Sequence, residues 1–159
     1  MKEFCITRDP LQTKKLGKQS AKKILKSKKR KNAFIIALKG ELGGGKTTFL
    51  QGFAGGLGIK EKILSPTFVI IKKFTIKNKT QHPTPNTYYH IDCYRIKKSK
   101  EILDLGFKEI ISNPQNIVAI EWADKIKKIL PKSVFWIKFK FINEKTREIV
   151  LSSNFPFPA

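Results

Sequence analysis

Cysteine is nearly absent from this chain of 159 residues, and other features that mark whole classes of protein are missing as well. Cys5 and Cys93 lie far apart without Cys-x-x-Cys spacing, which argues against a disulfide framework or a cysteine-rich zinc site. No apolar run approaches the roughly twenty residues of a membrane span, and residues 1–6 lack the long apolar core of a signal peptide. We therefore expect a cytoplasmic protein without membrane association.

Acidic residues and arginine are also scarce. The chain has 12 Asp and Glu against 33 Lys and Arg, only four of them arginine, and its formal net charge is +21. Such a charge suggests nucleic-acid binding, because lysine and arginine neutralise phosphates. Lysine, isoleucine and phenylalanine are abundant together, however, which an AT-rich coding sequence produces without selection for binding. A solvated, lysine-coated surface is the favoured interpretation, and a dedicated nucleic-acid face is the alternative.

Internal repeats are absent too, and the length fits one domain with a real core. We expect a single domain over residues 1–151 and a C-terminal tail over 152–159, where two prolines stand. The two histidines, His82 and His90, do not make a metal site. His90 is interpreted as a packing or hydrogen-bonding residue.

The chain does contain a complete phosphate-binding loop, because residues 40–47 follow the pattern G-x-x-x-x-G-K-T. Its glycines let successive backbone N–H groups point into one concavity, which a polyphosphate fills. Lys46 is expected to reach the β- and γ-phosphates as a point charge, and the Thr47 hydroxyl to take a position on Mg²⁺. The N-terminus of the following helix adds the positive end of its dipole.

The residues around this loop favour a nucleotide site over a glycine-rich turn without a ligand. Residues 33–38 form a continuous apolar run, which is typical of a buried parallel strand. After the loop, apolar residues recur at helical spacing from Phe49 to Leu57, and glycines at 55, 56 and 58 can end the helix. Strand, loop and helix are the arrangement that the motif requires.

The rest of the chain alternates between strand and helix patterns, which predicts an α/β fold. Asp9 is expected to cap a helix that begins at Pro10. The polar stretch 77–86 is interpreted as a loop between two strands, and the last two strands as an antiparallel hairpin. We expect strands at 4–7, 117–120, 133–142 and 148–151, one strand that begins at 69–71 and another that ends in 88–95. Helices are expected at 100–111, broken by Gly106, and at 123–129.

Two carboxylates are predicted at strand ends on the edge of the sheet where the phosphate loop lies. Asp92 lies in the strand end expected at 88–95, and alternation puts it on one side with His90 and Tyr94. Glu121 follows the buried strand 117–120, and ligands of α/β sheets bind at this edge. Such carboxylates hold Mg²⁺ or orient a water molecule. For Asp92, a structural salt bridge with Arg95 or a lysine is the alternative.

The segment Ser65-Pro66-Thr67-Phe68 leads into the apolar residues 69–71. Its proline favours an extended turn, and a threonine there can approach a nucleotide as a switch segment does. An ordinary turn before a strand explains these four residues equally well.

Together, these motifs resemble the bacterial TsaE (YjeE) family over about Asp9 to Leu151. The resemblance implies a three-layer P-loop NTPase fold with a mainly parallel sheet, antiparallel hairpins at the edges and helices on both faces. It also implies an ATPase that binds and hydrolyses ATP with Mg²⁺ to support formation of N6-threonylcarbamoyladenosine in tRNA. The implied partners are TsaB-like and TsaD-like proteins, with tRNA reached indirectly through their complex. The resemblance rests on residues 40–48, Ser65 to Phe68, His90 to Arg95, Asp104-Leu105-Gly106 and Glu121 to Asp124.

Carried over by position, the resemblance also implies residue roles. Asp92, Glu121 and Lys46 are the implied catalytic residues, and Thr47, Glu121 and Asp92 the implied metal ligands. Thr67 falls on the family's switch-like threonine, and Trp122 on the aromatic residue beside the site. The implied nucleotide-binding residues are Gly40, Glu41, Leu42, Gly43, Gly44, Gly45, Lys46, Thr47, Thr48, Thr67 and Trp122.

Three other functions compete with this one. A small nucleoside or nucleotide kinase shares the fold and the loop, but such enzymes usually bring several arginines from a lid, and here Arg95 is the one plausible candidate. A regulatory GTPase is disfavoured because no Asn-Lys-x-Asp sequence occurs. A basic RNA-binding protein is disfavoured because the chain lacks an RNP-like aromatic signature.

Overall fold

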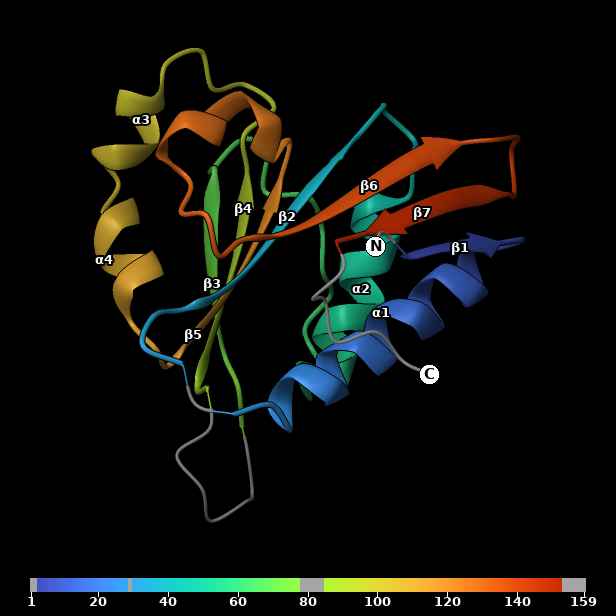
Figure 1. Cartoon of the computed structure of the whole chain (residues 1–159), viewed down its shortest axis with the longest axis horizontal. Helices are drawn as coiled ribbons and strands as arrows, with labels where there is room; N and C mark the ends of the chain where they lie inside the picture. The colour runs from blue at the N-terminus through green and yellow to red at the C-terminus, as the bar shows by residue number, and fades with distance from the viewer. Residues whose placement is uncertain (1–2, 29, 78–84, 153–159) are drawn as a thin grey trace.

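The computed structural model describes residues 3–28, 30–77 and 85–152, and its centre is a mixed sheet of seven strands (Figure 1). The strand order across the sheet is β1-β7-β6-β2-β5-β4-β3. The strands are β1 (Glu3–Thr7), β2 (Phe34–Gly40), β3 (Ile71–Thr75), β4 (Thr87–Asp92), β5 (Asn116–Glu121), β6 (Phe135–Phe141) and β7 (Arg147–Leu151). The helices are α1 (Pro10–Leu25), α2 (Lys46–Gly56), α3 (Ser99–Leu103), α4 (Phe107–Ser112) and the short 3-10 helix η1 (Ala123–Ile129).

The middle of the sheet is parallel. Strand β2 pairs in parallel with β5 on one side and β6 on the other, and β4 pairs in parallel with β5. Strand β3 runs antiparallel to β4, and β7 runs antiparallel to both β6 and β1. Five of the seven strands, β1, β2, β4, β5 and β6, therefore point the same way. The prediction of a mainly parallel sheet with antiparallel hairpins toward its edges is confirmed.

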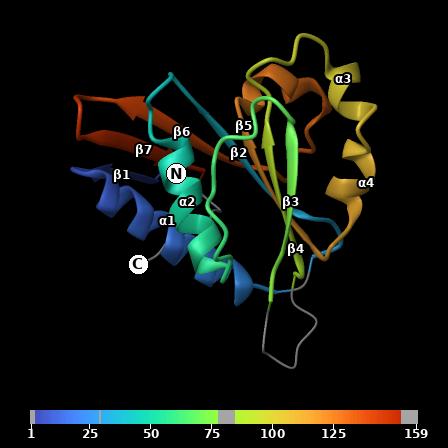
Figure 2. The same ribbon diagram turned by 180° about the vertical axis from the view of Figure 1, so that it is seen from behind.

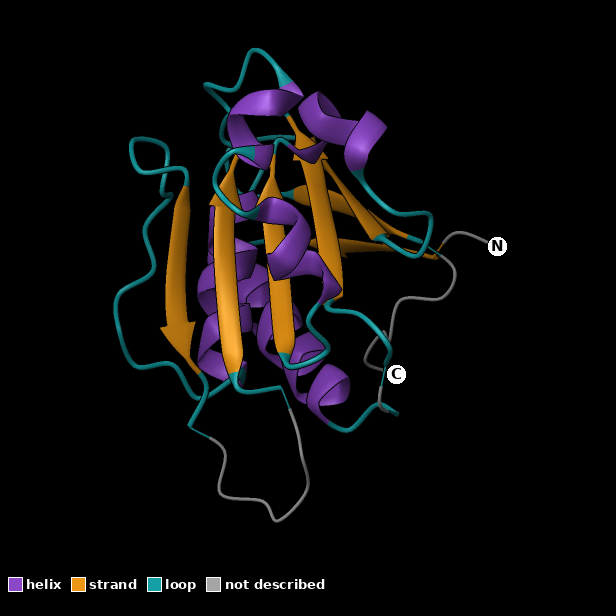
Figure 3. Cartoon of the chain, turned by 90° about the vertical axis from the view of Figure 1, so that its left-hand side faces the viewer, coloured by secondary structure: helices purple, strands orange, loops and turns teal. Residues whose placement is uncertain are grey.

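Helices cover both faces of the sheet, as predicted (Figure 3). Successive side chains of a strand point to opposite faces, and β2 shows this division. Its residues Phe34, Ile36 and Leu38 pack into a core with α1 and α2, whereas Ile35 and Ala37 pack into a second core with α3, α4 and η1. The continuous apolar pattern of β2 is explained by this burial on both sides.

Helices α1 and α2 approach each other closely, and glycines make the approach possible (Figure 2). A Cβ atom at Gly52 of α2 would lie 1.9 Å from the carbonyl oxygen of Lys14 in α1. A Cβ atom at Gly17 of α1 would lie 2.1 Å from the carbonyl oxygen of Phe49. The two backbones therefore touch, and both helices pack into the core on the same face of the sheet.

Gly52→Ala is therefore expected to lower the free energy of unfolding by on the order of 3 kcal/mol, because the added methyl group forces the two helices apart. Gly55→Ala is the matched control, since a Cβ there meets no atom within 4 Å. Alanine is the better helix former, so the control is expected to gain up to about 1 kcal/mol. Urea unfolding followed by circular dichroism measures both, and equal stability of the two variants would contradict the close packing.

Several predicted boundaries are confirmed and two are wrong, because β3 begins only at Ile71 and β4 ends at Asp92, before residues 93–95. Asp9 caps α1 by accepting a hydrogen bond from the backbone N–H of Gln12, at 2.8 Å, and Gly106 separates α3 from α4 with a φ of 81°. Residues 69 and 70 do not belong to β3. The backbone N–H of Ile70 donates to the carbonyl of Pro66 at 2.7 Å, and this turn places Ile70 at a φ of 65°.

Parts of two predicted segments lie outside the described residues: most of the loop expected at 77–86, with His82 in it, and residues 153–159 of the expected tail. The division into a domain and a tail stays a prediction.

Both cysteines are free thiols, and burial raises the pKa of Cys93 to about 12. None of the helices in the described ranges has the length and apolar character needed to cross a membrane.

Candidate functional site

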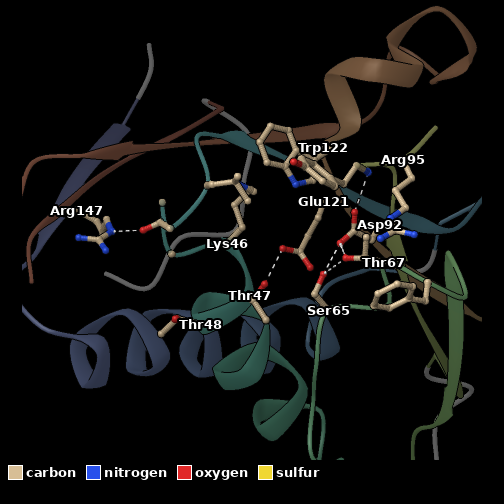
Figure 4. A pocket seen from close by; sticks show the side chains of 16 residues that line it. Lys46, Thr47, Thr48, Ser65, Thr67, Asp92, Arg95, Glu121, Trp122 and Arg147 are labelled. Carbon is tan, nitrogen blue, oxygen red and sulfur yellow. Dashed lines mark hydrogen bonds between the residues drawn. The ribbon is translucent and has the colours of Figure 1, made fainter. Parts of the chain in front are cut away.

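A cleft of about 580 Å³ opens at the edge of the sheet where the parallel strands β2, β4 and β5 end (Figure 4). This volume lies within the range of small-molecule sites. The cleft is lined by Leu42, Gly43, Gly44, Gly45, Lys46, Thr47, Thr48, Ser65, Thr67, Phe68, Asp92, Tyr94, Arg95, Glu121, Trp122 and Arg147. Of the predicted site residues, only Gly40 and Glu41 are not among these, although both contribute backbone carbonyls to the loop.

The loop from Gly40 to Lys46 has a backbone that requires glycine. A Cβ atom at Gly40 would lie 2.4 Å from the carbonyl oxygen of Phe139 in β6. Gly45, the N-cap of α2, has a φ of 96°, a conformation that residues with a side chain rarely adopt. The loop therefore passes directly from the end of β2 into the N-terminus of α2, where backbone N–H groups are free to bind an anion.

Lys46 lies across the loop. Its ammonium donates to the carbonyl oxygens of Gly40 and Glu41, each at 2.8 Å, and lies 4.3 Å from the centre of the Trp122 ring. The side chain is largely buried, and this burial lowers the pKa of Lys46, while the nearby carboxylates of Glu121 and Asp92 act in the opposite direction. A phosphate in the cleft would give this partly desolvated cation a strong partner.

Glu121 connects the loop to the sheet. Its Oε1 accepts a hydrogen bond from the Thr47 hydroxyl at 2.8 Å, and its Oε2 lies 2.7 Å from Nε2 of His90. Glu121 is the last residue of β5, whereas Thr47 is in the first turn of α2 and His90 is in β4. The structure therefore brings together Thr47 and Glu121, as predicted, and adds His90, whose link to Glu121 the sequence did not indicate.

Asp92, at the end of β4, is held by the segment that follows α2. Its Oδ2 accepts hydrogen bonds from the hydroxyls of Ser65 and Thr67, the latter at 3.0 Å, and its Oδ1 accepts from the backbone N–H of Tyr94 at 2.8 Å. Among the residues that the structure describes, these bonds hold Asp92, and no salt bridge with Arg95 or a lysine does. Arg95 instead lies over the ring of Phe68, 4.3 Å from its centre.

Trp122 and Thr48 also line the cleft where the resemblance placed them. Trp122 has a φ of 56°, and this left-handed conformation turns the chain between β5 and η1. Its ring lies near the ring of Tyr94, with 5.1 Å between the centres. Alternation placed Tyr94 on one side with His90 and Asp92, but Tyr94 was not assigned to the site, and the structure ends β4 at Asp92, two residues before it.

Arg147 is a further cleft residue that was not assigned to the site from the sequence, and the same holds for Ser65, Phe68 and Arg95. Arg147 begins β7, and its Nε donates to the carbonyl oxygen of Gly43 at 3.0 Å. Its Nη1 donates to the carbonyl oxygens of Asn143, at 2.6 Å, and Thr146, at 3.0 Å. Arg147 thereby ties the phosphate loop to the turn before β7. One available signal was its rarity, since it is one of four arginines in the chain.

The oxygen atoms in the cleft fit Mg²⁺. This cation prefers oxygen ligands and is usually bound by one or two carboxylates together with phosphates and water. Thr47, Glu121 and Asp92 supply a hydroxyl and two carboxylates. Among the residues that the structure describes, no group of three or more His, Cys, Asp or Glu side chains could hold a metal ion by itself. A cation held by Thr47, Glu121 and Asp92 would have positions left for phosphate oxygens and water molecules.

The three-layer fold and the glycine-rich loop at the end of β2 are those of the P-loop NTPase class of α/β proteins. A family model described as "Threonylcarbamoyl adenosine biosynthesis protein TsaE" matches residues 7–149. The chain belongs to this family, as the resemblance implied.

Individual relatives agree with the family model. A protein of Bacillus subtilis named "tRNA threonylcarbamoyladenosine biosynthesis protein TsaE" is 40% identical over 119 residues, which cover 75% of this chain and 69% of the relative. A protein of the same name from Treponema pallidum is 31% identical over 118 residues, 74% of this chain and 81% of the relative. The crystal structure of YdiB from Bacillus subtilis matches with a TM-score of 0.71 and 31% identity, and covers 95% of this chain and 84% of YdiB.

Proposed function

We propose that this protein binds and hydrolyses ATP with Mg²⁺ to support threonylcarbamoyladenosine formation in tRNA, together with a complex of the TsaB and TsaD type. The observation that carries the proposal is the convergence of Lys46 and Thr47 from α2, Asp92 from β4 and Glu121 from β5 on one cleft. Lysine, hydroxyl and two carboxylates around a glycine-rich loop are the groups that phosphoryl transfer from a nucleotide requires.

Each residue has a distinct part in this proposal. The backbone N–H groups at the start of α2 and the Lys46 ammonium bind the phosphates and balance their charge. The Thr47 hydroxyl donates a hydrogen bond to Glu121, which leaves the oxygen lone pairs of Thr47 free for a cation. The cation, when bound, neutralises the charge that develops on the phosphate oxygens. Asp92 orients the attacking water, and Trp122 packs beside Lys46 and limits access of solvent.

The segment 65–70 is the part of the cleft that we expect to change with the nucleotide. In the present conformation the hydroxyls of Ser65 and Thr67 occupy one oxygen of Asp92. Ile70 is β-branched and has a positive φ, a conformation that costs on the order of 1–3 kcal/mol. Rotation of this segment would release Asp92 toward the phosphates, which is the role of the switch-like threonine implied for Thr67.

A kinase is the second candidate, because two arginines, Arg95 and Arg147, line the cleft.

The deciding experiment measures ATP hydrolysis by the protein alone, with TsaB-type and TsaD-type proteins, and with a panel of nucleosides and nucleotides. Hydrolysis that rises with the partner proteins supports the proposal. Phosphate transfer to a nucleoside would replace it with the kinase, and a protein that consumes no ATP in any mixture would refute both.

The positive charge of the protein is expected to give only weak, non-specific RNA binding. Lysines are spread over the whole sequence and arginines are few, so electrostatic contact with phosphates dominates. We expect dissociation constants weaker than about 1 μM at physiological salt, a steep salt dependence, and no preference for a cognate tRNA over an unrelated one. Titrations of both tRNAs at several salt concentrations measure this. A selective complex that survives physiological salt without partner proteins would favour an RNA-binding function.

A further inference from the structure

His90 is a fully buried polar residue beside the cleft, and its described polar contact is with Glu121. Both side chains are almost completely shielded from solvent, with exposed fractions of 0% for His90 and 3% for Glu121. Burying an imidazole costs free energy unless it forms a hydrogen bond, and an apolar side chain would fill the same space at no such cost. The contact with Glu121 is therefore what favours histidine at this position.

The geometry assigns the shared hydrogen to His90. An ionised carboxylate only accepts hydrogen bonds, so Nε2 must carry the proton that lies between it and Oε2 of Glu121. Within the described residues Nδ1 has no hydrogen-bond partner. The tautomer with its hydrogen on Nε2 fits both facts, because Nδ1 then presents a lone pair and no N–H group is left buried without an acceptor.

The position of His90 in the sheet explains why it reaches Glu121. Alternation along β4 turns Tyr88, His90 and Asp92 toward the face covered by α2, and Asp92 is the register partner of Glu121 in β5. His90 therefore approaches Glu121 from within the core, on the opposite side from Thr47. One carboxylate oxygen is held by the sheet and the other by the phosphate loop.

We propose that His90 is a positioning residue, which fixes the Glu121 carboxylate in the orientation that meets Thr47 and Mg²⁺. Without the imidazole N–H, Oε2 of Glu121 would be buried without a donor, and the carboxylate would rotate to find one. Its bond to Thr47 would then be lost. The inference rests on the proposed function only in assigning Mg²⁺ to this cleft. Partners of this kind, behind a metal ligand, typically contribute 10-fold to 100-fold in metal affinity or activity.

The test is the Mg²⁺ coupling ratio, defined as the dissociation constant of ADP in EDTA divided by that in saturating Mg²⁺. We expect His90→Leu to lower this ratio by on the order of tenfold while the value in EDTA stays unchanged. His90→Gln keeps an N–H donor of similar reach and is expected to restore most of the ratio. Tyr88→Phe is the matched control, because it alters the neighbouring buried ring on the same face of β4 and is expected to leave the ratio unchanged.

A double-mutant cycle makes the test specific for Glu121. Once Glu121→Gln has removed the carboxylate, adding His90→Leu is expected to lower the ratio no further. An unchanged ratio in His90→Leu, a His90→Gln variant as impaired as His90→Leu, or additive effects in the cycle would each overturn the inference. If His90→Leu does not fold, His90→Asn takes its place, because its shorter amide does not reach Glu121.

This result is separable from the test of the proposed function. A wild-type protein that binds ADP in a Mg²⁺-dependent manner but hydrolyses no ATP with its partners refutes the proposed activity and leaves the coupling ratio to decide on His90. A wild-type protein that hydrolyses ATP, with an unaltered ratio in His90→Leu, keeps the activity and removes the role of His90.

Discussion

Lys46→Ala is expected to weaken ATP binding by on the order of a hundredfold or more, because a charge-assisted hydrogen bond contributes about 1.5–3 kcal/mol and the ammonium is expected to reach two phosphates. The fold is expected to survive. Lys46 is a buried cation that bonds to two loop carbonyls at the mouth of an open cleft, where water can replace it. Isothermal titration calorimetry with ATP and Mg²⁺ measures the affinity, and thermal unfolding of the free protein checks the fold.

Lys60→Ala is the control for this prediction. Lys60 is exposed and follows α2 at a distance from the cleft, so the substitution removes the same charge from the basic surface without touching the loop. Its ATP affinity is expected to stay within about twofold of wild type, as is usual for an exposed charge that salt screens and that does not contact the ligand. An unchanged affinity in Lys46→Ala would remove the phosphate loop from the proposed function.

Glu121→Gln is expected to slow ATP hydrolysis by on the order of a hundredfold or more, with a modest effect on ATP affinity. The carboxylate accepts hydrogen bonds at both oxygens, from Thr47 and from His90. A glutamine offers one acceptor oxygen, so one of the two donors loses its partner, and the negative charge for Mg²⁺ is lost as well. Single-turnover hydrolysis in the presence of the partner proteins measures the effect, and Asp92→Asn is expected to behave similarly.

Asp124→Asn is the matched control for the charge of Glu121. Asp124 is an exposed carboxylate three residues further along the chain and does not line the cleft. It contributes to the field at Lys46, but it makes none of the contacts of Glu121. Hydrolysis by this variant is expected to stay within about threefold of wild type, as for an exposed and screened charge. Normal hydrolysis by Glu121→Gln would reduce Glu121 to a structural residue.

The elements that position the site follow from local sequence patterns. The apolar run before the loop, the glycines within it and the helical spacing after it are all near neighbours in the chain, so the strand, loop and helix were predictable. Glu121 was predictable for a related reason, because the end of a buried strand can be located from its apolar residues.

Two kinds of feature could not be predicted: contacts between residues distant in the sequence, and backbone conformations that differ from the local secondary-structure propensity. Arg147 meets Gly43 across more than a hundred residues of chain, and no periodicity encodes which strand lies beside the loop. His90 looked like any buried strand residue until β4 and β5 were placed in register. At Ile70 the β-branched side chain favours a strand, but the hydrogen bond to Pro66 stabilises a turn.

The backbone contact between α1 and α2 determines which parts of the cleft can respond to a ligand. Because the backbones of α1 and α2 already touch at Gly17 and Gly52, movement of α2 toward α1 would cause steric overlap, and we expect the loop and Thr47 to move little. The conformational entropy lost on nucleotide binding must therefore come mainly from segment 65–70, which is short and partly exposed. Ordering so few residues costs little affinity, and loops of this size rearrange in nanoseconds to microseconds, much faster than a domain movement.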